Sequence, residues 1–226
     1  MTAVLFNVLT VTAGSLLGMF LKKGIPQRVT EALMIGVGLC VLYIGISGAL
    51  KGTNTLVLIV AMALGTVIGT LLDIDGKLNR VARFVESKFQ GRNKNISIAE
   101  GFVAGSLLFC IGAMTIVGSL QAGLTGNMDT LFTKATLDLI SSMVLATSLG
   151  FGVTLSAVFV LLFQGGLVLL SGVIAPFLTD YAIAEMTCAG SVLIIGLGLN
   201  LIGITKIKVA NYLPVIFLPP LLCLFM

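Results

Sequence analysis

Residues 139–179, LISSMVLATSLGFGVTLSAVFVLLFQGGLVLLSGVIAPFLT, form a stretch of 41 residues without one formal charge. As a single helix this stretch would be roughly 60 Å long, about twice the thickness of the hydrocarbon core of a bilayer. It therefore predicts two membrane-spanning helices rather than one. Gly150, Phe151 and Gly152 are the best place for the turn between them, and Pro176 ends the second helix.

The composition of the whole chain agrees with this reading. Of its 226 residues 58% are hydrophobic and 10% are charged, whereas a soluble domain carries about a quarter charged residues. The charges are too few to cover a water-facing surface, so the composition predicts an all-α, polytopic integral membrane protein. Because the chain contains no histidine, imidazole metal sites and Ser-His-Asp triads are excluded. We expect no catalytic residues, metal, cofactor or nucleic-acid partner.

Apolar runs recur along the chain, which we interpret as a single membrane domain covering residues 1–226. Each run is long enough for a spanning helix of about 20 residues. The eight predicted spans are 2–21, 30–50, 54–72, 100–120, 130–149, 153–175, 185–204 and 209–226. Between the third and fourth spans, residues 76–92 have the period of an amphipathic helix with a basic face. This segment either lies on the membrane surface or is a solvated helical linker.

The basic residues predict the orientation of the chain. Lys22 and Lys23 follow the first apolar run instead of preceding it, so this run is a retained helix with its N-terminus outside, not a signal peptide. With eight crossings, the inner connections hold all of the 13 basic residues except Lys51 and Lys134. The positive-inside rule therefore favours eight spans.

Polar side chains within the spans are the candidate functional residues, because such groups are costly at membrane depth. Asp138 lies about nine residues into the fifth span, and Lys134, one turn earlier, can pair with it. The pair either takes part in conduction or only stabilises the helix end. Asn7, Gln164 and Asn200 carry amide side chains within other spans, and each of them can simply form a hydrogen bond across helices. The candidate polar path consists of Asp138, Lys134, Ser141, Ser142, Gln164, Asn200 and Asn7.

A candidate helix break lies in the fourth span. Two glycines and two hydroxyl residues there permit a locally unwound helix whose carbonyl groups coordinate an ion. These residues are Gly112, Thr115, Gly118 and Ser119.

Other glycines have the GxxxG spacing, which is typical of close helix packing and of dimerisation. The sequence leaves both open, and a homo-oligomer is one of the expected partners. The pairs are Gly14/Gly18, Gly65/Gly69 and Gly101/Gly105.

Three short segments resemble one another: residues 13–17, 104–108 and 189–193, in spans one, four and seven. A repeated unit of three helices must invert, because three is odd, and inverted repeats are common in secondary transporters. A competing register pairs residues 56–69 with residues 137–150. The sequence thus suggests inverted three-helix repeats without deciding their register.

Several longer strings are similar to one bacterial family. They are EGFV at 100–103, LLFCIGAM at 107–114, IVGS at 116–119, Thr133-Lys134 with Asp138 and Ser141-Ser142, IGLGLN at 195–200, and KVANYLP at 208–214. They resemble the YdfK/YqgA-like bacterial membrane proteins, domain-of-unknown-function family 554, over nearly the whole chain. The resemblance implies a multi-pass protein of the bacterial cytoplasmic (inner) membrane. It carries over no catalytic or binding residue.

The intramembrane polarity and the repeat pattern predict a small transporter or channel that moves an ion or small solute. The alternative is a non-transporting scaffold or sensor that recruits partners through the basic cytoplasmic segment 77–94. An intramembrane enzyme would need an activated nucleophile, and none is evident, so we expect no enzyme. The lipid bilayer is the remaining expected partner.

Overall fold

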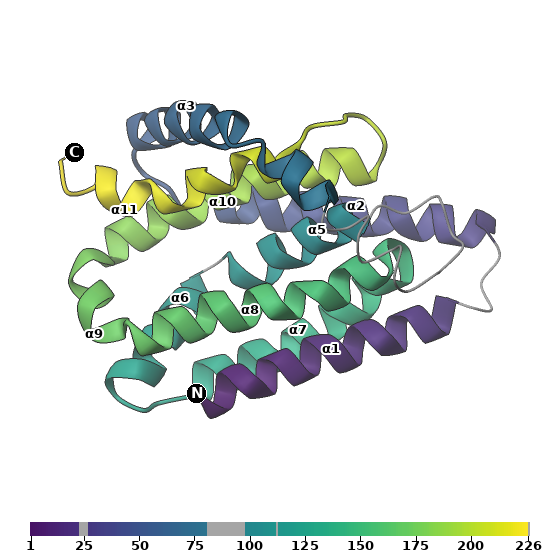
Figure 1. The fold of residues 1–226 in the computed structure, drawn as a ribbon, viewed down its shortest axis with the longest axis horizontal. Helices are drawn as coiled ribbons and strands as arrows, with labels where there is room; N and C mark the ends of the chain where they lie inside the picture. Colours follow the sequence, from purple (N-terminus) through teal and green to yellow (C-terminus); the bar gives the residue numbers. More distant parts are fainter. Residues whose placement is uncertain (23–26, 81–97, 112, 226) are drawn as a thin grey trace.

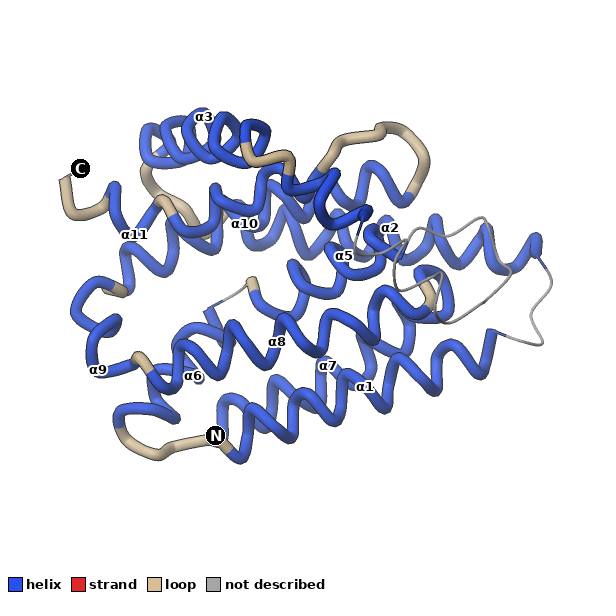
Figure 2. Tube along the Cα trace, viewed as in Figure 1, coloured by secondary structure: helices blue, strands red, loops and turns tan. Residues whose placement is uncertain are grey.

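The computed structural model describes residues 1–22, 27–80, 98–111 and 113–225. In these ranges the regular elements are all helices, which confirms the all-α prediction (Figure 2). The helices are α1 (Thr2–Lys22), α2 (Gln27–Ala49), α3 (Thr55–Leu71), α5 (Ile98–Cys110), α6 (Ala113–Leu124), α7 (Asp129–Leu149), α8 (Phe151–Leu169), α9 (Ser171–Ile174), η1 (Ala175–Phe177), α10 (Asp180–Leu201), η2 (Val209–Phe217) and α11 (Pro219–Leu222).

Several of these helices meet the length and hydropathy that a membrane crossing needs. Within the described ranges α1, α8 and α10 do so singly. Two bent pairs also qualify if each pair counts as one span: α3 with the helical segment Ile74–Arg80, at 46°, and α5 with α6, at 60°. The described chain therefore holds three to five candidate spans by length and composition. Residues 81–92 of the predicted amphipathic segment lie outside the described residues.

Helix ends follow local chemistry. Helix α10 begins at Asp180, earlier than the predicted 185, because the Thr179 hydroxyl accepts a hydrogen bond from the Ala182 N–H at 3.2 Å and caps the first turn. The last apolar run, 209–226, forms the 3₁₀ helix η2 and the short α11 rather than one α-helix. Pro214 and Pro219 explain this interruption, since proline has no N–H for the helical ladder.

Among the described residues, four pairs of helices pack closely at two or more glycines of one helix. Glycines of α1 face α7, those of α5 face α8, those of α2 face α10, and those of α3 face η2. In three of these pairs the glycine lies against a serine of the partner helix: Gly14 against Ser142, Gly105 against Ser156, and Gly48 against Ser191. The three predicted GxxxG pairs thus lie at helix contacts within the chain, where the missing side chain lets two backbones approach.

These contacts also give the relative directions of the helices. Helices α1 and α7 run parallel, because Gly14 faces Ser142 and Gly18 faces Ala146. By the same reasoning α5 and α8 are parallel, whereas α2 and α10, and α3 and η2, are antiparallel. Figure 1 shows α5 running opposite to α1.

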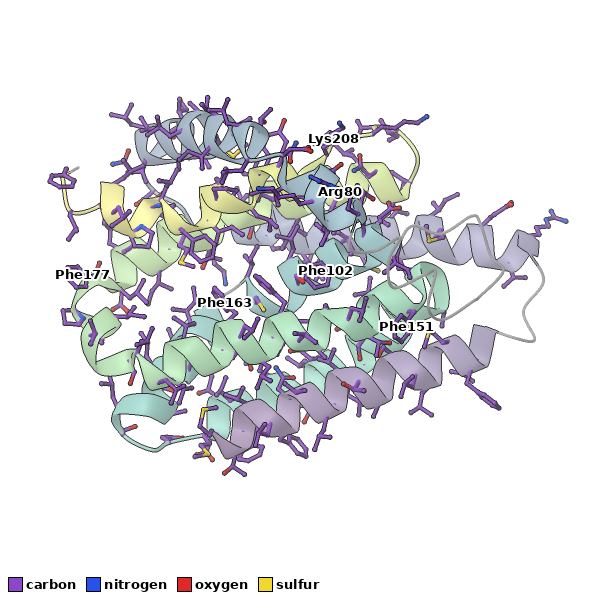
Figure 3. All side chains as sticks on the ribbon, in the orientation of Figure 1. Arg80, Phe102, Phe151, Phe163, Phe177 and Lys208 are labelled. Atoms are coloured by element: carbon purple, nitrogen blue, oxygen red, sulfur yellow. The ribbon has the colours of Figure 1, made fainter. Side chains whose placement is uncertain are left out.

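The molecule has two distinct ends. At the terminal end lie both chain termini and α9 (Figure 1), with the loop 50–54, which is hydrogen-bonded to α10 near its start. At the basic end lie the turn at Gly150 and the loop 202–208. Figure 3 shows Arg80 and Lys208 toward the basic end and Phe177 at the terminal end.

The turn between α7 and α8 depends on Gly150, the position that the uncharged stretch predicts. Its backbone has φ 65° and ψ −145°, a conformation that residues with a Cβ rarely adopt. We expect Gly150→Ala to lower the free energy of unfolding by about 1–3 kcal/mol. Gly166→Ala in α8, where an added methyl meets no atom within 4 Å, is the matched control. Denaturant unfolding followed by circular dichroism measures both, and equal stability of the two variants would contradict the prediction.

Candidate functional site

Four polar side chains meet where α1, α7 and α8 pack together, and we call them the polar cluster. Asn7 comes from α1, Lys134 and Asp138 from α7, and Gln164 from α8. Their exposed fractions are 0%, 8%, 3% and 0%. Burial of two ionisable and two amide side chains in an apolar helical bundle is costly unless these groups bind one another. The cluster is therefore the strongest candidate site in the described chain.

The four side chains form one hydrogen-bonded row. Lys134 Nζ donates to Asp138 Oδ1 at 2.5 Å. Asn7 Nδ2 donates to Asp138 Oδ2 and to Gln164 Oε1, both at 3.1 Å. The Thr10 hydroxyl donates to the Asn7 backbone carbonyl at 2.8 Å and also lies 3.3 Å from Asn7 Oδ1. Both oxygens of the Asp138 carboxylate therefore have donors, and Asn7 joins the ion pair to Gln164.

Local geometry explains why these residues meet. Lys134 and Asp138 are four residues apart and share one face of α7. Asn7 lies seven residues, or about two turns, before Gly14 and so shares its face of α1. Because Gly14 packs against Ser142, one turn beyond Asp138, the close helix contact places Asn7 opposite the carboxylate. The glycine contact thus sets the register of the site.

At one end of the row a hydrogen-bond donor has no partner. Gln164 Nε2 is buried and has no hydrogen-bond partner in the described structure. A buried donor without a partner costs about 1–3 kcal/mol. At the other end of the row, Lys134 Nζ lies 5.9 Å from the centroid of the Phe109 ring, within the range of a cation–π interaction. The arrangement combines a carboxylate, an ammonium group and an amide donor without a partner in one buried site.

A helix break lies beside the cluster. Helix α5 ends at Cys110 and α6 begins at Ala113, and Gly112 lies outside the described residues. The Thr115 hydroxyl donates to the Phe109 carbonyl oxygen at 3.0 Å, so it satisfies a carbonyl at the end of α5. Because the centroid of the Phe109 ring lies 5.9 Å from Lys134 Nζ, the break and the ion pair are neighbours.

The break is shorter than the predicted unwound stretch. Thr115 lies in the first turn of α6, and Gly118 and Ser119 lie within that helix. Gly118 packs against Thr130 and Leu131 of α7, which accounts for a residue without a side chain there. The buried Ser119 hydroxyl has no hydrogen-bond partner among the described residues.

Three residues of the predicted path do not join the cluster. Ser142 is buried, but its hydroxyl donates to the Leu139 carbonyl at 3.0 Å and faces Gly14. Ser141 lies on the exposed face of α7. Asn200 lies at the basic end, where it accepts from Ile207 N–H at 2.9 Å and donates to the Ile207 carbonyl at 2.7 Å. Its role there is to hold the loop after α10, so a single path through all seven residues is not formed.

Comparison with known proteins decides the family. The family described as "Protein of unknown function (DUF554)" matches residues 2–224. The chain belongs to the DUF554 family. It is 33% identical over 224 residues to "Uncharacterized membrane protein YdfK" of Bacillus subtilis (strain 168), covering 97% of this chain and 94% of that protein.

A second relative of this DUF554 protein is "Uncharacterized protein YqgA" of Escherichia coli (strain K12). The two are 29% identical over 215 residues, covering 94% of this chain and 92% of YqgA. No solved structure matches the chain. The printed name of YdfK and the apolar helices agree that this DUF554 protein is a helical membrane protein.

This DUF554 protein also holds a cavity at its basic end, lined by both apolar and polar residues. The cavity has a volume of about 390 Å³ and is open to the surface. Its polar lining comes from Asp75, Asn79, Glu100, Asn200, Thr205, Lys206 and Lys208. Asn200, a predicted path residue, therefore faces a second polar region, separate from the cluster at α1, α7 and α8.

One buried acid of this DUF554 protein was missed as a site by the sequence reasoning. Glu185 is 1% exposed, and no sequence motif singles it out. It lies five residues after the start of α10 and accepts hydrogen bonds from the loop before α3. The sequence feature that could have identified Glu185 is an acidic residue within an apolar run that has no basic residue one turn away.

Proposed function

We propose that this DUF554 protein is a small transporter or channel of the bacterial cytoplasmic membrane that moves an ion or small solute. The observation that carries the proposal is the polar cluster. A buried ion pair is a weak source of stability, and ionisable groups inside membrane proteins usually mark ion or substrate pathways. Gln164 Nε2 is a hydrogen-bond donor without a partner, and the break between α5 and α6 lies beside the cluster. Transporter sites use both polar groups and broken helices.

The proposal includes eight crossings with the N-terminus outside. Eight alternating spans would make α1 and α7 parallel, α5 and α8 parallel, α2 and α10 antiparallel, and α3 and η2 antiparallel. The glycine contacts have these four relations. Opposite directions of α1 and α5 also suit inverted three-helix repeats. In this arrangement the inner connections would hold the basic residues Lys22, Arg28, Lys77, Arg80, Lys206 and Lys208 of the described ranges.

Cysteine labelling tests this orientation. In a variant lacking the four native cysteines, we expect Lys51→Cys to react with a membrane-impermeant maleimide in intact cells. Lys208→Cys should react only after the membrane is permeabilised, because the proposed topology places the connection before η2 on the cytoplasmic side. Labelling of Lys208→Cys in intact cells, or protection of Lys51→Cys, would contradict the proposed topology.

Flux measurements test transport. Purified protein in proteoliposomes is assayed against a panel of inorganic ions and small metabolites, and we expect flux of at least one of them. Gln164→Leu removes the acceptor of Asn7 and the free donor, so we expect it to lower that flux at least about tenfold, the effect of losing roughly 1.4 kcal/mol. Gln121→Leu is the matched control, since Gln121 lies on α6 and accepts from Thr130 at 2.9 Å. Flux unchanged by Gln164→Leu, or absent for every solute, would reject the proposal.

The charge distribution favours one alternative, a membrane scaffold or sensor. Basic residues gathered at one end can attract acidic partners or anionic lipids. In that case Lys77→Gln with Arg80→Gln should abolish partner recruitment while insertion is unchanged. A homo-oligomer remains a prediction, but the GxxxG glycines are occupied by contacts within the chain. An oligomer would therefore use another face.

A further inference from the structure

Two cavities lie next to each other along α5 and η2, and their linings differ in chemistry. The first is the cavity of about 390 Å³ at the basic end, which we call the charged cavity. The second has a volume of about 380 Å³ and lies between α3, α5, α8 and η2, and we call it the apolar cavity. The residues of the polar cluster line neither of them, so both stand apart from the site described above.

The walls of the two cavities meet on three elements. On α5, Val103 lines the charged cavity and Leu107, one turn further, lines the apolar cavity. After α3, Asp75 lines the charged cavity and its neighbour Ile74 lines the apolar one. Helix η2 contributes residues to both, and the Asp75 N–H donates to Asn211 Oδ1 of η2 at 2.7 Å. A ligand with a polar part and an apolar part can therefore occupy both cavities at once.

The apolar cavity suits hydrocarbon. Its lining side chains are apolar except for Ser106 and Cys110, and each of these two residues is only 2% exposed. Phe159, Phe163 and Phe217 form one side, with ring centroids 6.0 Å and 6.3 Å apart. Water would lack the polar partners that it needs there, and protein interiors leave few voids of this size empty. Hydrocarbon is the occupant that matches this wall.

The apolar cavity also reaches the outer surface of the bundle. Leu72 and Phe217 line it and are about half exposed, at 50% and 53%. Helix α8 and the bent pair of α3 with Ile74–Arg80 are candidate membrane spans, so the surface between them borders on lipid. The hydrocarbon available at this opening is the acyl chain of a membrane lipid.

The charged cavity carries two cationic and two acidic side chains. Lys206 and Lys208 line it together with Asp75 and Glu100, and within the described ranges neither lysine forms an ion pair. Asn79 Nδ2 donates to Asp75 Oδ2 at 3.0 Å and so holds this carboxylate at the cavity. Lysines bind phosphate oxygens, and carboxylates accept from an ammonium group. A headgroup with one phosphate and one primary ammonium group complements this lining.

We propose that the two cavities together bind one phospholipid of the phosphatidylethanolamine type, with its head in the charged cavity and an acyl chain in the apolar cavity. The direction of α5 fits this placement. The helix starts at the basic end, where Gly101 packs against Gly152 beside the turn at Gly150, and the apolar cavity follows further along it. Figure 3 shows Phe163 farther from the basic end than Lys208.

The proposed orientation assigns this lipid to the cytoplasmic leaflet, where basic pockets between spanning helices bind lipid heads. Binding of the lipid does not require that the chain transports a solute. The tests below therefore measure binding without flux, and loss of transport in the flux assay would leave their results unaffected.

Native mass spectrometry of the purified chain is the first test. Phosphatidylethanolamine, phosphatidylglycerol and phosphatidylcholine with identical acyl chains are added separately to the protein in mild detergent. We expect one bound phosphatidylethanolamine per chain and weaker binding of the other two lipids. Equal binding of the three lipids, or tighter binding of phosphatidylglycerol, would overturn the proposed head.

Variants of the charged cavity extend this test. Lys206→Gln with Lys208→Gln should weaken phosphatidylethanolamine binding about tenfold, because two contacts to the phosphate are lost. Lys77→Gln with Arg80→Gln is the matched control, since it removes the same charge from exposed residues that line neither cavity. Equal losses in the two double variants would overturn the site.

Tryptophan fluorescence tests the acyl chain. The chain contains no tryptophan, so Phe163→Trp in the apolar cavity and Leu162→Trp on the outer face of α8, 68% exposed, each report on one place. Brominated acyl chains quench a tryptophan that they contact. We expect brominated phosphatidylethanolamine to quench Phe163→Trp more than brominated phosphatidylcholine does, and the two lipids to quench Leu162→Trp equally.

Adding Lys206→Gln and Lys208→Gln should remove this lipid preference at Phe163→Trp and leave the quenching of Leu162→Trp unchanged. Equal quenching of Phe163→Trp by both lipids, or a preference that survives the loss of both lysines, would overturn the link between head and chain. If Phe163→Trp does not fold, mass spectrometry of the wild-type chain and its surface variants still decides.

Discussion

Lys134→Met, with Asp138 retained, is expected to lower the free energy of unfolding by about 3–5 kcal/mol, and Asp138→Asn with Lys134 retained by a similar amount. Each change leaves one buried charge without its partner, at exposed fractions of 3% for Asp138 and 8% for Lys134. The measurement is unfolding of the purified protein in mixed detergent micelles, followed by circular dichroism.

The double variant Lys134→Met with Asp138→Asn separates a structural role from a functional one. It buries no unpaired charge, and the asparagine oxygen can still accept from Asn7. We therefore expect it to recover most of the stability that either single change loses. If the two single effects simply added, the ion pair would not be coupled in the folded protein, and the assigned contact would be wrong.

Flux of the stable double variant then decides between the two interpretations of the pair. If the pair takes part in transport, the double variant folds but transports no more than protein-free liposomes. Flux equal to that of the wild type would show that Lys134 and Asp138 only stabilise α7. The stability measurement is the control, since it excludes misfolding as the cause of lost flux.

Gly18→Ala is expected to lower both the free energy of unfolding and the flux. A methyl group at this position would overlap the carbonyl oxygen of Met143 and lie 3.1 Å from Cβ of Ala146, so α1 and α7 would have to separate. Overpacking of this kind lowers the free energy of unfolding by about 1–3 kcal/mol. The same shift would lengthen the hydrogen bond between Asn7 and Asp138, so flux should fall together with stability.

Gly36→Ala is the matched control for this prediction. Gly36 also lies within a long helix, but an added methyl there meets no atom within 4 Å. Because glycine in a helix interior is less favourable than alanine, this change should stabilise the protein by about 0.5–1 kcal/mol. A stability for Gly18→Ala equal to that of Gly36→Ala would show that α1 and α7 are not in close contact.

The sequence alone determined the features that depend on near neighbours. The absence of charge over 139–179 required membrane-length helices, and Gly150 supplied the turn between α7 and α8. Spacing of four residues on one helix brought Lys134 to Asp138. These features follow from hydropathy and helical period, which act within a few turns of one chain segment.

Only the tertiary structure decided which distant groups meet. Asn7 donates a hydrogen bond to Asp138, which lies 131 positions away in the sequence. Glu185 accepts a hydrogen bond from the loop at Thr53 rather than from its own helix. Asn200 donates a hydrogen bond to the loop after α10. In a soluble helix the apolar stripe tells which face is buried. Here the lipid-facing and protein-facing sides are both apolar, since lipid tails are as apolar as leucine. The rotation and register of each helix are therefore set by close contacts at small residues such as Gly14, which become visible only when two helices are placed together.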